Sequence, residues 1–165
     1  MPPITSLTRL SPAACLGTVL PFRKPFVLRS HRHETNHSPP VYQVFSWYVA
    51  HDLPATPVNP GTPTITALSR EHKTVPSLSD LPKPRETAVS IITPPAVTQE
   101  LLEEAKKLGI PAVWLQPGTF DDSVIEFARA DGAFEAVVAG DGGRGSEGWC
   151  VLVDGERALK AAGKL

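Results

Sequence analysis

Short apolar segments alternate with amphipathic segments between residues 88 and 139, and this alternation restricts the fold more than any other feature. The apolar segments, at 88–92, 112–116 and 134–139, are short and rich in β-branched residues, as buried strands are. The segments between them place apolar residues every three or four positions, which is typical of helices. Turns of two to four residues join the elements. This order predicts parallel strands with right-handed helical crossovers.

A further helix and strand precede this alternation. Val44, Phe45 and Tyr48 recur at helical spacing from residue 41 onward, and Pro54 ends the helix. Residues 55–58 form a short extended segment. The sequence therefore predicts an α/β domain over residues 41–165, built as a doubly wound parallel sheet. Residues 61–85 are rich in Pro, Ser and Thr and are expected to hold little regular structure beyond one candidate strand at 71–75.

Local signals at the helix ends agree with this order. Pro94 and Pro95 suit the first turn of a helix, where a missing N–H costs nothing, and Gly109 stands where a helix-terminating glycine belongs. Thr119 followed by Asp122 has the form of a capping box for the next helix. These signals predict helices over 95–108 and from about 120 onward.

Residues 1–40 have a different composition. They carry five Lys or Arg residues against one acidic residue, and only two of the chain's 12 glycines precede residue 86. We expect a disordered or irregular leader, with a candidate first strand at 26–30. The basic, Ser/Thr-containing composition also resembles a mitochondrial transit peptide, so mitochondrial localisation is the alternative to a cytoplasmic one. His31, His33 and His37 match no standard metal-ligand spacing.

Composition excludes several classes of protein. The net charge of -1 argues against a strongly basic nucleic-acid binder, and no apolar run is long enough to cross a membrane. Two cysteines with no zinc-type spacing suit a soluble protein in a reducing, intracellular compartment. The predicted first strand and first helix are not joined by a Gly-x-Gly-x-x-Gly motif, which a dinucleotide site would need there. The sequence has no nucleophile elbow, and no acid–base pair stands at a credible spacing. We therefore name no catalytic and no metal-binding residue.

Candidate ligand-binding residues follow from the topology. In open α/β sheets the ligand lies beyond the carboxyl ends of the strands, and four predicted turns meet at that edge. They contribute the candidate residues Asn59 and Pro60, Thr93, Pro94 and Pro95, Gln116 and Gly118, and Gly142, Gly143 and Arg144.

Each candidate has a plain structural alternative. The glycine-rich loop 140–148 could direct backbone N–H groups and Arg144 at a phosphate, or be a surface loop. Gln116 could bond a ligand or a neighbouring loop, and Asn59 could simply form an Asx-turn. Trp149 is expected to be buried against the last strand or helix.

Several stretches resemble the CoA-binding-domain family, small single-domain Rossmann-like relatives of the CoA-binding domain of the succinyl-CoA synthetase alpha subunit. The similar stretches are 44–48 leading into 53–60, then 89–95, 112–118 and 137–145, the last as in fungal members. The resemblance spans residues 42–165 and implies coenzyme A as the ligand. It also implies a glycine-containing phosphate loop with a lysine near residues 26–41. Residues 31–40 contain neither residue type, which predicts weak CoA binding or a replaced N-terminus.

Three functions remain open at this point. The first is a CoA- or nucleotide-binding single-domain protein without catalysis, whose partner is a small molecule and not nucleic acid or membrane. The second is an enzyme, either an NAD(P)-dependent oxidoreductase or a ligase-related one. The third is a truncated, non-binding remnant, which a well-formed strand at 26–30 between the strands at 55–58 and 88–92 would argue against. The sequence does not indicate an oligomeric state.

Overall fold

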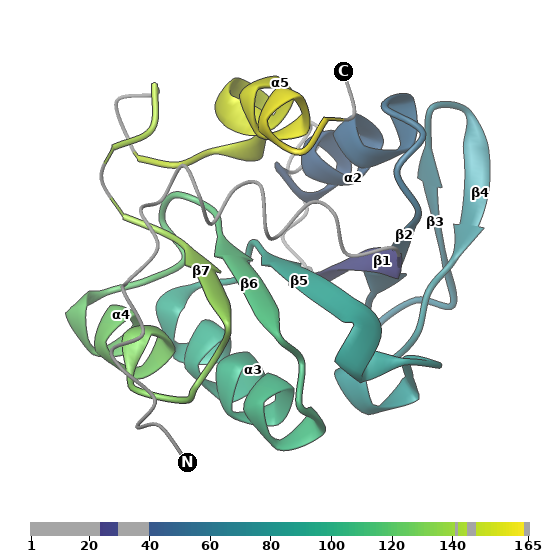
Figure 1. Ribbon diagram of the computed structural model, residues 1–165. Helices are drawn as coiled ribbons and strands as arrows, with labels where there is room; N and C mark the ends of the chain where they lie inside the picture. Colours follow the sequence, from purple (N-terminus) through teal and green to yellow (C-terminus); the bar gives the residue numbers. More distant parts are fainter. Residues whose placement is uncertain (1–23, 30–39, 141, 145–147, 164–165) are drawn as a thin grey trace, which may run out of the picture.

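Parallel strands form the central sheet of the molecule (Figure 1). The computed structural model describes residues 24–29, 40–140, 142–144 and 148–163. The strand order across the sheet is β2 (Ala55–Val58), β1 (Lys24–Arg29), β5 (Thr87–Ile91), β6 (Ala112–Leu115) and β7 (Ala136–Val138). All neighbouring pairs in this sheet are parallel, which confirms the α/β class predicted from the alternation.

Helices cover both faces of the sheet. Figure 1 shows α2 (Pro40–Ala50) and α5 (Val151–Ala161) on one face, and α3 (Pro95–Leu108) and α4 (Asp122–Arg129) on the other. Strand side chains alternate between the two layers. Trp114 packs with Phe45 and Tyr48 of α2, whereas Val113 and Leu115 pack beneath α3 and α4. The doubly wound arrangement is therefore confirmed.

The position of β1 decides how the sheet is organised. β1 lies between β2 and β5, with Val27 in register with Thr56 on one side and with Val89 on the other. It overlaps the candidate first strand at 26–30, and this central position is the arrangement that argues against a truncated remnant. After β1, the chain forms β2 on one side of β1, and it later forms β5 on the other side. Ligands of open α/β sheets bind at such a switch point, here between β1 and β5.

The expectation of little regular structure over residues 61–85 is wrong. This region contains the antiparallel hairpin of β3 (Thr64–Ala67) and β4 (Arg70–Lys73), followed by the short 3₁₀ helices η1 (Leu78–Asp80) and η2 (Pro84–Glu86). The candidate strand at 71–75 is thus one residue late at its start and two late at its end. Tertiary packing selects the hairpin: Ile65 is buried, and the His72 ring meets Phe45 edge-on at 4.9 Å.

The turn of this hairpin is strained, and it offers a stability test. Leu68 and Ser69 have backbone φ values of 49° and 60°, which residues other than Gly, Asn and Asp rarely adopt. Replacing both, as Leu68→Asn with Ser69→Gly, should stabilise the protein by about 1 kcal/mol, because Asn-Gly favours this geometry. Urea unfolding monitored by circular dichroism measures the change. An equal or lower midpoint for the double variant would contradict the prediction.

The capping predictions have mixed outcomes. Gly109 ends α3 with φ at 70°, as predicted, and Pro95 opens the same helix. The capping box at Thr119 is wrong, because the Thr119 hydroxyl donates to the Gln116 carbonyl at 2.6 Å. Asp121 caps α4 instead, accepting from the Val124 N–H at 3.0 Å. That hydrogen bond, with a second from the Ser123 hydroxyl, holds the pKa of Asp121 below its usual value.

Candidate functional site

The carboxyl edge of the sheet gathers all four candidate turns. Asn59 follows β2, Thr93 follows β5, Gln116 follows β6, and Gly142 stands shortly after β7. Because the strands are parallel, these turns emerge on the same side (Figure 1). Residues 30–39, which connect β1 to α2 and include most of the expected phosphate loop, lie outside the described residues.

The turn after β2 is held by its own side chain. The Asn59 Oδ1 atom accepts a hydrogen bond from the Gly61 N–H at 2.8 Å, which forms an Asx-turn. The Asn59 N–H donates to the Val75 carbonyl at 2.9 Å, and Val75 returns a bond to Pro57 at 3.0 Å. These bonds fix the turn and leave the Pro60 ring exposed at the edge.

The turn after β5 starts α3. The Thr93 side chain is buried, and its hydroxyl lies 2.9 Å from that of Thr98, which also bonds the Thr93 carbonyl at 2.9 Å. This pair fastens the end of β5 to the first turns of α3. Pro94 and Pro95 carry the chain from strand to helix, and Pro94 is exposed at the edge.

Gln116 joins three elements from a buried position. Its Nε2 donates to the Ser90 hydroxyl of β5 at 3.1 Å, and its Oε1 accepts from the Val151 N–H of α5 at 2.9 Å. The Tyr48 hydroxyl of α2 lies in the same buried polar group: burial raises its pKa, and a hydrogen bond with Ser90 opposes that shift. Both ends of the Gln116 amide therefore have partners within the protein. Two residues further on, Gly118 is exposed, with φ at 80°.

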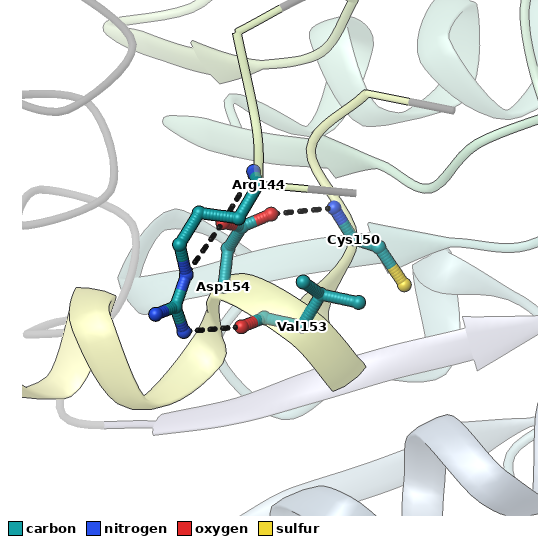
Figure 2. A network of polar contacts seen from close by, with 4 residues as sticks. All are labelled: Arg144, Cys150, Val153 and Asp154. Carbon is teal, nitrogen blue, oxygen red and sulfur yellow. Dashed lines mark hydrogen bonds and ion pairs between the residues drawn. The ribbon is translucent and has the colours of Figure 1, made fainter. Parts of the chain in front are cut away.

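A buried carboxylate organises the glycine-rich loop (Figure 2). Asp154, in the first turn of α5, has 0% exposure. Its Oδ1 accepts from the Arg144 N–H at 3.0 Å and lies 3.9 Å from the Arg144 Nε, while its Oδ2 accepts from the Cys150 N–H at 3.3 Å. The Arg144 Nη2 donates to the Val153 carbonyl at 2.9 Å, and the Arg144 side chain stays 62% exposed.

Close packing explains two of the glycines in this loop. A Cβ on Gly143 would lie 2.5 Å from the Gly148 carbonyl oxygen and 2.7 Å from Asp154 Oδ2, so no larger residue fits. Gly142 has φ at 108° and packs against the indole of Trp149, which is buried as predicted. One backbone N–H of the loop, that of Arg144, thus points at the chain's own carboxylate and not at a ligand.

Sequence reasoning missed Asp154 as a residue of this site. The available signal was an acidic residue in the first turn of the last helix, four positions after Cys150. That position favours negative charge but does not identify which loop the carboxylate contacts. Within the described ranges, no group of three potential metal ligands is found, and no helix is long and apolar enough to span a membrane. The histidines at 31–37 lie outside those ranges.

Comparisons with known proteins agree with this architecture. A family model described as "CoA binding domain" matches residues 33–141, more than half of the chain. No match was found among curated proteins. Three solved structures are similar. A hypothetical protein from Pyrococcus horikoshii is 24% identical with a TM-score of 0.66, and the match covers 96% of this chain and 99% of that one. A protein from Thermus thermophilus (20% identity, TM-score 0.60, covering 88% of this chain and 94% of that one) and a conserved hypothetical protein from Pyrococcus furiosus (20% identity, TM-score 0.56, covering 69% and 91%) are also similar. These structural likenesses support the fold.

Proposed function

Because this chain belongs to the CoA-binding domain family, we propose that it binds coenzyme A or a related nucleotide at the carboxyl edge of its sheet, without a catalytic step of its own. The observation that carries the proposal is the switch point between β1 and β5, where the strand order reverses. Nucleotides bind at such points in open α/β sheets. The family match ends at residue 141, and most of the glycine-rich loop and all of α5 follow it.

The candidate residues divide into two roles in this proposal. Pro60, Pro94, Gly118, Gly142 and Arg144 are exposed at the edge and form its accessible surface, with Arg144 as the contact for a ligand phosphate. Asn59, Pro95, Thr93, Gln116 and Gly143 stand behind them and hold the turns in place.

The enzymatic alternatives have less support at this edge. The carboxylate found there, Asp154, is fully buried and accepts hydrogen bonds from the loop, so it is poorly placed to exchange protons with a substrate. An NAD(P)-dependent oxidoreductase or a ligase-related activity therefore remains the second candidate. Cytoplasmic localisation, with mitochondria as the alternative, is part of the same proposal.

A ligand titration tests the proposal. We expect coenzyme A at millimolar concentration to raise the unfolding midpoint slightly, since a ligand at a concentration equal to its Kd stabilises a protein by about 0.4 kcal/mol. Millimolar affinity is expected because residues 31–40 contain neither glycine nor lysine. The same titration with dephospho-CoA, ATP and NAD identifies the part of the nucleotide that is recognised.

Two arginine variants make the titration specific. Arg144→Ala should weaken CoA binding about tenfold, which is the loss of one charge-assisted contact. Arg85→Ala is the matched control, because Arg85 is exposed but precedes β5 and so lies at the opposite, amino edge of the sheet. A wild-type protein whose midpoint is unchanged by all four nucleotides would overturn the proposed function.

A further inference from the structure

The Asp154 carboxylate occupies the place that an anionic ligand takes in a backbone nest. It accepts from two backbone N–H groups, that of Arg144 in the glycine-rich loop and that of Cys150, which caps α5 just after the loop (Figure 2). Converging backbone N–H groups of this kind form binding sites for phosphate and other anions. The Arg144 guanidinium adds a positive charge on the same side, with Nε 3.9 Å from Oδ1.

We propose that Asp154 is a positioning residue: its carboxylate is an internal anion that replaces a ligand phosphate inside the glycine-rich loop and fixes Arg144 at the carboxyl edge of the sheet. The loop then contributes the Arg144 side chain to recognition, while the Arg144 N–H is held by Asp154. Only the identity of the ligand that Arg144 meets rests on the proposed function; the internal anion itself does not.

The geometry around the carboxylate supports this role. The backbone of Asp154 is fixed beside the loop, because its N–H donates to the Cys150 carbonyl at 2.7 Å in the first turn of α5. A Cβ on Gly143 would lie 2.7 Å from Oδ2, so the loop backbone packs directly against the carboxylate. Arg144 is held at two further points, by its Nε near Oδ1 and by its Nη2 at the Val153 carbonyl.

The competing explanation is that Asp154 only fills space beneath the loop. A neutral side chain of the same shape would then serve equally well. If the charge matters, asparagine cannot replace Asp154. Its amide NH₂ would face one of the N–H donors, and the attraction to the Arg144 guanidinium would be lost. An added small anion could replace the carboxylate only under the internal-anion hypothesis.

Chemical rescue distinguishes these explanations without any nucleotide. We compare Asp154→Ala and Asp154→Asn with the wild type and with Asp122→Ala, the control at an exposed acidic residue in the first turn of α4. Both Asp154 variants should lower the unfolding midpoint by roughly 5 °C. Sodium formate at about 100 mM, relative to sodium chloride at equal ionic strength, should restore part of that loss in Asp154→Ala alone, because formate binds only the folded state.

Amide hydrogen exchange gives a second readout. In the wild type the Arg144 and Cys150 amides should exchange slowly, and in Asp154→Asn at least about tenfold faster, whereas Asp122→Ala should leave them unchanged. The proposal is overturned if formate stabilises Asp154→Ala no more than the wild type, or if Asp154→Asn keeps the exchange protection. If Asp154→Ala does not fold, the amide exchange rates of Asp154→Asn and the wild type decide between the two explanations. Failure of the nucleotide titration would instead overturn only the proposed function.

Discussion

Replacing Gly155 with alanine is expected to destabilise the protein by about 3 kcal/mol, although alanine is the better helix former. Gly155 lies in α5 where this helix packs on α2, and a Cβ there would come within 2.3 Å of Trp47 Cζ2 and 2.5 Å of Cη2. The indole cannot withdraw freely, since it stacks on the His51 ring at 4.1 Å and meets Tyr48 edge-on at 5.3 Å. The clash therefore outweighs the gain in helix propensity, which is about 1 kcal/mol.

A double variant tests whether the clash is the cause. Trp47→Leu removes the ring atoms nearest Gly155, so adding Gly155→Ala to it should cost less than about 1 kcal/mol. Urea denaturation followed by far-ultraviolet circular dichroism gives the free energy of unfolding for each variant. If Gly155→Ala costs as much in the Trp47→Leu background as in the wild type, the clash is not the source of the loss.

The strands and helices of the second half could be predicted because their signals are local. Ala112 to Leu115 is a short apolar run, and Gly109 marks the helix end before it, so no distant partner is needed to recognise either. The hairpin of β3 and β4 lacks such signals: its turn is Leu68-Ser69, with neither Asn nor Gly. Its formation depends on contacts with α2, such as that between His72 and Phe45, which a sequence pattern does not display.

The position of the candidate turns could be predicted, but not the contacts that their side chains make. The rule that ligands lie beyond parallel strand ends correctly brings the four turns to one edge. What each side chain does there depends on partners remote in sequence. Gln116 bonds Ser90 and Val151, which are 26 and 35 positions away, and the Arg144 N–H bonds Asp154, ten positions on. Glycine richness suggested an anion nest, yet the chain itself supplies the anion.

Gln116→Leu is expected to destabilise the protein by about 3 kcal/mol, because it leaves two buried polar groups without this partner. The amide is 4% exposed, and leucine of similar size can neither accept from the Val151 N–H nor donate to the Ser90 hydroxyl. Both losses fall on the contact between the sheet and the start of α5, so α5 should loosen first. Urea denaturation measures the free energy, and amide exchange at Val151 locates the opening.

The same chemical change at Gln99 is the matched control. Gln99 is half-buried on α3 and donates to Glu103 at 3.1 Å, so Gln99→Leu removes one hydrogen bond and should change the free energy of unfolding by less than about 1 kcal/mol. If Gln116→Leu keeps wild-type stability but loses nucleotide binding, Gln116 acts on the ligand directly. Its assignment as a residue that holds the turns in place would then be wrong.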